Sequence, residues 1–216
     1  MKYERILLDV EAQHDFFDPG GNCYTPEARK ARANLYRLFH WARQENIPVM
    51  STVLRIRKGE QGPLSVTPHC VEETEGEWKM PGTVMATRIN LGLLNTTDLP
   101  RDIFERFQQV IFEKRDTDIF AHPRAERLIT ELEGGTFILC GAGVAHGIVQ
   151  AAVGLRNRGF SVILAEDAVV SLNHPLAEMA LRRMEAKSVV FVPTREIIAP
   201  RPARVASRFR KAVSAK

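Results

Sequence analysis

The sequence predicts an α/β protein built on a doubly wound, mostly parallel sheet of six strands, with helices on both faces. Two features carry this prediction. Short apolar segments alternate with amphipathic ones along the chain, as expected where each parallel strand is followed by a crossover helix. In addition, residues 136–168 form a complete βαβ pattern, in which an apolar strand, a glycine-rich turn, an amphipathic helix and a second apolar strand follow one another.

The other elements follow from apolar periodicity and from helix-end signals. We expect strands at residues 5–11, 48–54, 110–114, 136–140, 161–168 and 188–193. We expect helices at residues 26–45, 101–108, 123–133, 148–158 and 175–186. Thr25 is a suitable N-cap for the first helix and Pro26 fits its first turn, whereas Gly134-Gly135 ends the third.

One domain over residues 1–199 and a basic tail over residues 200–216 account for the length and the charge. The tail holds six Lys and Arg residues and no acid, so removing it from the whole-chain net charge of +4 leaves about −2 for the domain. A disordered, solubilising tail and a contact with nucleic acid or another anionic surface both remain open. No other part of the sequence resembles a nucleic-acid-binding motif.

Composition and termini favour a cytoplasmic protein. The first residues lead directly into a strand, so we expect no signal peptide, and no apolar run reaches the ~18–20 residues of a membrane span. Cys23, Cys70 and Cys140 are odd in number and widely spaced, which fits neither a metal signature nor a disulfide framework. We therefore expect no metal and no cofactor.

The segment from Gly59 to Met85 is rich in Gly, Pro and Glu and is longer than a passive connection. We expect it to serve as a lid or as an interface arm.

Polar residues follow three of the predicted strands, at the edge where ligands bind in open parallel sheets. Asp9, Glu11 and Gln13 would share one face if the first strand continues to Gln13. Lys114 ends the third strand, and the glycine turn of residues 141–147 follows the fourth. A carboxylate, an ammonium and backbone N–H groups at one edge could support acid–base chemistry with oxyanion stabilisation.

The glycine turn also imitates a dinucleotide-binding fingerprint, with Gly141, Gly143 and Gly147 followed by Glu166 as a ribose acceptor. The glycine spacing is looser than that fingerprint, and the unit comes fourth rather than first along the chain. Binding of a nicotinamide cofactor is thus the weaker interpretation.

The same segments resemble the isochorismatase-like (cysteine hydrolase) superfamily. Its acid two residues before Gln, followed by Asp-Phe, is similar to residues 11–16, and its catalytic Lys six residues before a Phe is similar to Lys114 and Phe120. Gly159 stands twelve residues after Gly147, as a family glycine does after the nucleophile. Further similar segments are residues 69–76, 166–168 and 181–184. The resemblance implies a Rossmann-like three-layer sandwich, a small-molecule substrate and a homo-oligomer.

Three departures from the family pattern affect the expected chemistry. Glu11 stands where the family usually has Asp, and Gly147 stands at the nucleophile position, where the family usually has Cys. The family's metal-binding Asp and His after the second strand are replaced by residues 53–57, Val-Leu-Arg-Ile-Arg. An amidase that depends on a thiolate is therefore not expected.

The resemblance implies a hydrolase that acts without the Cys, as the branch that cleaves vinyl ethers by proton donation and water attack does. Glu11 would be the acid or base, and Lys114 its electrostatic partner. Gly143 and Val144 would shape the oxyanion turn through a non-proline cis peptide. The substrate-binding residues implied by the resemblance are Gln13, Phe120, Gly143, Val144 and His146.

Structural readings of the same residues stay open. Glu11 and Lys114 could form a buried structural ion pair, and His146 could pack or cap at a helix N-terminus. Cys140 fits an inert position in an apolar strand, and a nucleophilic role for Cys70 is the weaker reading. A catalytically inactive family member that acts as a binding or regulatory module through its basic tail is the alternative function.

Overall fold

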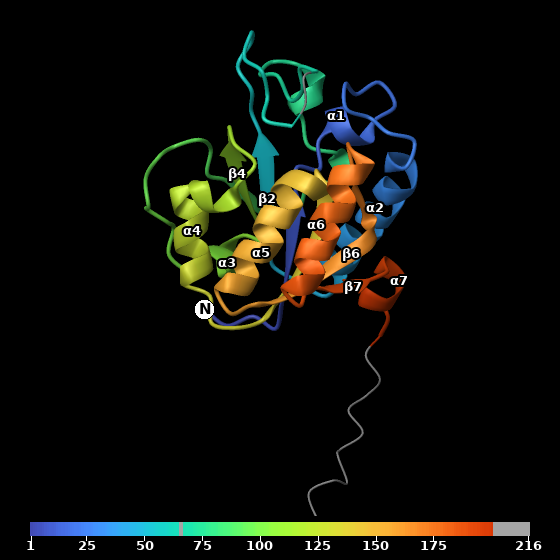
Figure 1. Cartoon of the computed structure of the whole chain (residues 1–216). Coiled ribbons are helices and arrows are strands. Elements are labelled where there is room, and N and C mark those ends of the chain that lie inside the picture. The colour runs from blue at the N-terminus through green and yellow to red at the C-terminus, as the bar shows by residue number, and fades with distance from the viewer. Residues whose placement is uncertain (65–66, 201–216) are drawn as a thin grey trace, which may run out of the picture.

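The computed structural model describes residues 1–64 and 67–200, and within these residues the chain forms one parallel sheet (Figure 1). The strand order is β3-β4-β2-β1-β5-β6-β7, and every neighbouring pair is parallel. The strands are β1 (Arg5–Val10), β2 (Val49–Leu54), β3 (Arg88–Asn90), β4 (Gln109–Lys114), β5 (Thr136–Ala142), β6 (Ser161–Val170) and β7 (Val190–Val192).

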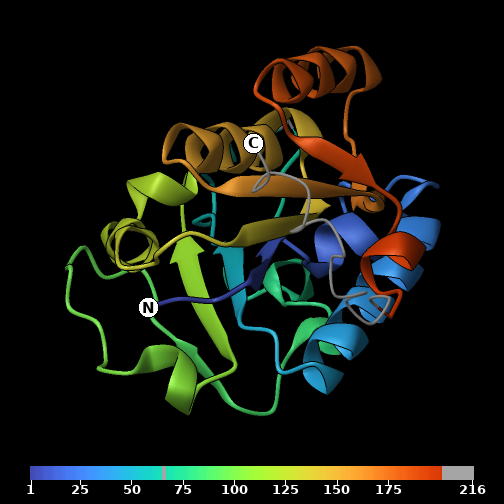
Figure 2. The same cartoon turned by 90° about the horizontal axis from the view of Figure 1, so that it is seen from below.

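Helices cover both faces of the sheet, which gives three layers. The α-helices are α1 (His14–Phe17), α2 (Ala28–Gln44), α3 (Ile103–Arg106), α4 (Pro123–Thr130), α5 (Val149–Asn157), α6 (His174–Ala186) and α7 (Thr194–Ile197). Short 3-10 helices are η1 (Glu75–Glu77), η2 (Pro81–Thr83) and η3 (Ile119–Ala121), and η4 (Val144–Ile148) is a π-helical turn. Figure 2 shows α5 and α6 on one side of the sheet and α2 on the other. In the described part of the chain, no helix is long and apolar enough to cross a membrane.

Side-chain alternation along the central strand explains the two cores. Ile6 and Leu8 of β1 pack into the core beneath α4, α5 and α6, whereas Leu7 packs into the core beneath α2. A central parallel strand buried on both faces is apolar at nearly every position, as Ile6-Leu7-Leu8 is. The predicted fold class is therefore confirmed.

The number of strands differs from the prediction, because the sheet has seven strands within the described residues rather than six. The additional strand, β3, pairs with β4 at the edge of the sheet. Only three residues long and mostly exposed, β3 lacks the apolar run that identifies buried strands. The predicted cis peptide in the glycine turn is also wrong, since no cis bond occurs among the described residues.

The described residues of the segment from Gly59 to Met85 lie at the carboxyl ends of the strands, above the sheet in Figure 1. The amide of Met80 donates to the carbonyl of Ala12 at 2.9 Å, and the amide of His14 donates to the carbonyl of Trp78 at 2.9 Å. Val71 also forms a parallel bridge with Ile56. The segment thereby covers the edge of the sheet at which ligand sites lie in this class of fold.

We expect Gly141→Ala to lower the free energy of unfolding by about 3 kcal/mol or more. Gly141 has φ +118°, and a Cβ there would lie 1.9 Å from the carbonyl oxygen of Val10 in the neighbouring strand. Urea unfolding followed by circular dichroism measures the change. Gly159→Ala is the matched control, because φ is +85° there but no atom lies within 4 Å, so a cost of about 1 kcal/mol is expected. Equal costs at the two positions would contradict the packing argument.

Candidate active site

Glu11 and Lys114 meet above the carboxyl end of β2, which lies between β1 and β4 in the sheet. The Nζ atom of Lys114 donates to Oε1 of Glu11 at 2.5 Å and to the carbonyl oxygens of Asp116 and Thr117, both at 2.8 Å. The three donors of the ammonium therefore have three acceptors. Both side chains are buried, with 0% of Glu11 and 5% of Lys114 exposed. The structure thus brings the predicted acid and its electrostatic partner into direct contact.

The backbone of Glu11 has a left-handed conformation, which directs its side chain toward Lys114. The strand β1 ends at Val10, and Glu11 has φ +54°. The strand therefore ends one residue before the predicted end at Glu11 and does not continue to Gln13, so Asp9, Glu11 and Gln13 do not share one sheet face by alternation. Asp9 instead forms a separate buried ion pair with Lys79 and accepts a hydrogen bond from Ser51.

The second carboxyl oxygen of Glu11, Oε2, is buried and has no hydrogen-bond partner among the described residues. Burial raises the pKa of Glu11 above its usual range, while the charge and hydrogen bond of Lys114 and the charge of His69 act in the opposite direction. The net upward direction means that Glu11 holds its proton to a higher pH than a solvated carboxyl group. Such a carboxyl group can act as a proton donor.

The glycine turn approaches Glu11 from the side of β5. A Cβ placed at Gly147 would lie 3.0 Å from Oε1 of Glu11 and 2.9 Å from Cγ1 of Val10. A Cβ at Gly143 would lie 3.8 Å from Oε2 of Glu11. Glu11 is longer than the Asp that the family usually has at this position. It fits here because Gly147 beside it has no side chain.

The backbone of the turn is irregular, with consequences for its predicted roles. Gly143 has φ +76° and its N–H donates to the carbonyl of Val170, so Gly143 shapes the turn while its own N–H is occupied. Val144 is buried, whereas His146 is half-buried and has φ −127° and ψ −106°, outside the helical region. Burial lowers the pKa of His146, and the charge of His69 lowers it further. His146 is therefore a neutral ring where the turn meets solvent.

The other two predicted substrate-binding residues make internal contacts. Gln13 is buried, donates to the carbonyls of Leu54 and Glu77 at 2.9 and 2.8 Å, and accepts from the amide of Leu54 at 2.8 Å. Phe120 packs against α5, where its ring lies 3.9 Å from the guanidinium carbon of Arg158. The hydrogen bonds of Gln13 link the chain after β1 to the end of β2. The packing of Phe120 holds the loop after β4 against α5.

The structure adds His69 and Cys70 to the surroundings of Glu11, although sequence reasoning named no role for His69. His69 is fully buried, its Nδ1 lies 2.9 Å from the carbonyl oxygen of Thr67, and its charge acts on Glu11. Burial raises the pKa of the Cys70 thiol well above its usual range, so this thiol is no ready nucleophile. The resemblance of residues 69–76 to family segments was the signal that could have identified His69.

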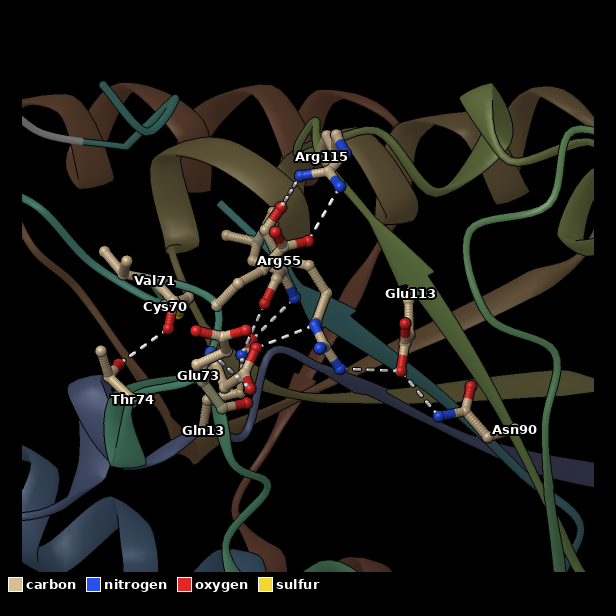
Figure 3. A network of polar contacts seen from close by, with 12 residues as sticks. Gln13, Arg55, Cys70, Val71, Glu73, Thr74, Asn90, Glu113 and Arg115 are labelled. Carbon is tan, nitrogen blue, oxygen red and sulfur yellow. Dashed lines mark hydrogen bonds and ion pairs between the residues drawn. The ribbon is translucent and has the colours of Figure 1, made fainter. Parts of the chain in front are cut away.

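A network of ion pairs borders the site (Figure 3). Arg55, at the end of β2, lies 2.8 Å from Oε2 of Glu77 and 3.1 Å from Oε1 of Glu113, while Arg115 contacts Glu72 at 2.8 Å. Asn90 donates to Glu113 at 2.7 Å. These carboxylates are paired with guanidinium groups, and no cluster of three or more His, Cys, Asp or Glu residues in the described residues could hold a metal ion. The side chains present here do not fit a metal centre.

Two cavities lie beside the site. One, of about 520 Å³, is lined by Val144 of the turn together with residues of α2, β6 and α6. The other, of about 320 Å³, is lined by Lys114 and by the loop that follows it. Glu11 lines neither cavity, so in this conformation it is enclosed by protein.

Comparisons with known proteins found one matching domain model and several similar folds. The isochorismatase domain model matches residues 95–196. The nicotinamidase/pyrazinamidase of Bacillus subtilis has a similar structure, with a TM-score of 0.67 and 18% identity, covering 88% of this chain and 100% of that one. An isochorismatase family protein of Desulfovibrio vulgaris has a TM-score of 0.67 and 19% identity, covering 90% and 96%. No curated protein matches the sequence.

A zinc complex is also among the similar structures. The pyrazinamidase of Pyrococcus horikoshii, crystallised with zinc, has a TM-score of 0.64 and 20% identity, covering 88% of this chain and 99% of that one. At these identities the structural likeness concerns the fold, while the domain model places the second half of the sheet, including Lys114 and the glycine turn, within a known domain. Residues 95–196 thus match the isochorismatase domain, and the fold of the chain is similar to that of isochorismatase-like hydrolases.

Proposed function

We propose that this protein hydrolyses a small polar metabolite by acid–base chemistry that needs neither a covalent intermediate nor a metal ion. Glu11 acts as the acid or base, Lys114 is its electrostatic partner, and the glycine turn of residues 141–147 is the oxyanion site. The observation that carries the proposal is that the two carboxyl oxygens of Glu11 have different surroundings. Its Oε1 is held by Lys114, while its Oε2 is unpartnered among the described residues and lies beside the glycine turn.

This arrangement suits proton donation to a leaving group. A carboxyl group whose pKa is raised by burial stays protonated to a higher pH than a solvated carboxyl group, and in that protonated form it can transfer its proton to a developing anion. After the transfer, the adjacent ammonium of Lys114 stabilises the carboxylate. Gly147 offers no nucleophile and the thiol of Cys70 stays protonated, so water is the attacking group.

The similar structures suggest which substrates to test first. They include nicotinamidase/pyrazinamidase enzymes and the N-carbamoylsarcosine amidase of Thermoplasma acidophilum, which is 15% identical with a TM-score of 0.63 and covers 89% of this chain and 97% of that one. A panel of small amides, esters and vinyl ethers therefore covers the chemistry of the neighbours and of the domain family. We further propose that the protein works in the cytoplasm as a homo-oligomer.

The second candidate function is a binding or regulatory module without catalysis, with the basic tail as its contact. The enclosure of Glu11 favours it, because the carboxyl group is 0% exposed and lines neither of the neighbouring cavities. The tail residues 201–216 lie outside the described residues. Deleting residues 200–216 should then abolish capture of a partner and leave the melting temperature unchanged.

We expect Glu11→Gln to lower kcat/KM on any substrate found in the panel by about 10²- to 10⁴-fold, because the amide cannot donate the carboxyl proton. The matched control is Asp9→Asn. Asp9 lies on β1, two residues before Glu11. It is equally buried and is also paired with a lysine, but it faces the α2 side of the sheet. Asp9→Asn should leave kcat/KM within a few-fold of the wild type. A panel without turnover, or equal losses in both variants, would contradict the proposed chemistry.

We also expect the stability advantage of the wild type over Glu11→Gln to shrink as pH rises from about 4.5 toward neutrality. The folded-state pKa of Glu11 is raised above its ordinary value of 4.5, so the folded state binds more protons than the unfolded state in this window. The contribution of Glu11 to stability is fully present below the unfolded pKa and is lost as pH rises through the folded pKa. Urea unfolding of both variants between pH 4 and 8 measures the difference. A constant difference would mean that the folded pKa is not raised.

A further inference from the structure

The larger of the two cavities beside the site has an apolar floor and an acidic rim. Its volume of about 520 Å³ lies within the range of about 300–1,000 Å³ that is typical of ligand pockets. Buried side chains of the glycine turn, β6 and α6 build the floor, namely Val144, Leu164 and Ala177. Exposed carboxylates stand on the rim, namely Glu27, Glu166 and Glu178. The proposed chemistry at Glu11 involves none of these carboxylates.

The charge of the rim is not balanced by its described neighbours. Four of the described lining residues are acidic, whereas Lys30 is the one lysine or arginine among them. Glu166 and Glu178 form no ion pair with another described residue. By contrast, the carboxylates that border Glu11 are paired with guanidinium groups. An occupant that combines positive charge with an apolar group therefore fits this cavity.

Residues 201–216 of the same chain, which lie outside the described residues, carry this combination. Six of these sixteen residues are Lys or Arg, and none is acidic. Phe209 is the one aromatic residue among them and stands between Arg208 and Arg210. Aromatic and arginine side chains are the commonest anchors of protein interfaces, where an apolar group fills a pocket and charged groups surround it. The sequence Arg208-Phe209-Arg210 thus matches an apolar floor with an acidic rim.

The cavity lies within reach of these residues. Asp167, which lines it, accepts hydrogen bonds from the N–H and the hydroxyl of Thr194 at 2.8 and 2.6 Å. Thr194 begins α7, which lies on the same side of the molecule as α2 and α6 in Figure 1. Pro200, the last described residue, is six residues further on, so at most about 22 Å of chain separate the two. Nine more residues to Phe209 can span about 30 Å, which is enough to return to the cavity.

We infer that residues 201–216 dock in this cavity of their own chain, with Phe209 on the apolar floor and Arg208 and Arg210 at the acidic rim. This contact goes beyond the proposed function. Attachment to the same chain gives the segment an effective concentration on the order of millimolar, so even a weak contact is populated. Because Val144 lines the cavity, the docked segment also packs beside the glycine turn.

Carbodiimide cross-linking of the full chain tests which carboxylates the segment contacts, because this reagent joins a lysine amine only to a carboxylate that touches it. Lys211 stands two residues after Phe209. We expect mass spectrometry to find Lys211 joined to Glu27, Glu166 or Glu178. An equal mixture of ¹⁴N- and ¹⁵N-labelled protein separates links within one chain from links between two copies, since only the latter have mixed masses.

Trypsin cleavage after Arg204 measures how much of the segment is docked. A docked segment is cleaved from its undocked form, so we expect Phe209→Ala and Glu178→Arg each to raise the cleavage rate by at least about threefold. Val213→Ala is the matched control within the segment, because it also shortens an apolar side chain but lies away from the arginine pair. Glu75→Arg is the control for the charge reversal, because Glu75 is exposed in η1 and does not line the cavity. Neither control should change the rate.

Three results would overturn the inference. The first is a set of Lys211 links that omits the rim carboxylates, for example links to Glu45 in the cavity beside Pro200. The second is a set of links with mixed masses, which would mean that the segment docks on another copy. The third is an unchanged cleavage rate in a folded Phe209→Ala variant, with folding checked by circular dichroism. None of these measurements involves turnover, so the inference and the proposed function can fail independently.

Discussion

The burial of the Lys114 ammonium is the constraint on which the rest of the site depends. A charge removed from water is tolerated only when its donors are satisfied and its charge is compensated. The three donors of Lys114 are satisfied by Glu11 and by two backbone carbonyls from the loop that follows β4, and Glu11 compensates the charge when it is ionised. Because those acceptors come from two separate parts of the chain, the ammonium fixes the end of β1 and the loop after β4 relative to each other.

The requirement to reach Lys114 explains the local strain around Glu11. A strand that continued past Val10 would direct Glu11 by simple alternation, but the left-handed φ of +54° redirects it over β2. The turn after β5 must then avoid the displaced carboxylate. Gly141 passes so close to the carbonyl of Val10 that no side chain fits, and at Gly147 a side chain would touch Glu11. The position of the Glu11 side chain and the absence of side chains at Gly141 and Gly147 therefore depend on each other.

The fold and the Glu11–Lys114 contact were predictable because both follow from local patterns and from the rule that parallel strands end at one edge. Six of the strands contain apolar runs that mark them, and their ends carry the polar residues. The strand β3 was missed because three mostly exposed residues carry no such run. The role of Gln13 as an internal tie was missed because it depends on the left-handed turn at Glu11, which apolar periodicity does not report.

The position of His69 could not be predicted for a related reason. It lies in the segment from Gly59 to Met85, where no periodic element fixes the direction of a side chain. Its placement depends on long-range contacts, such as the bond from Cys70 to Asp15 and the cover provided by Gly62. Sequence patterns describe helices and strands well, but they do not report which loop residue is pressed against a strand end.

Position relative to the sheet distinguishes the Glu11 pair from the similar pair formed by Asp9 and Lys79. Both carboxylates are fully buried, both contact a lysine, and each has one oxygen without a partner among the described residues. An unpartnered oxygen is therefore no sufficient mark of a site. Asp9 is still within β1 and lies under α2, whereas Glu11 lies past the strand end and beside the glycine turn. The charge of His69 also acts on the pKa of Glu11. Of the two pairs, the second lies at the strand ends beside a backbone turn whose glycines leave room for the carboxyl group, which is why the chemistry is assigned there.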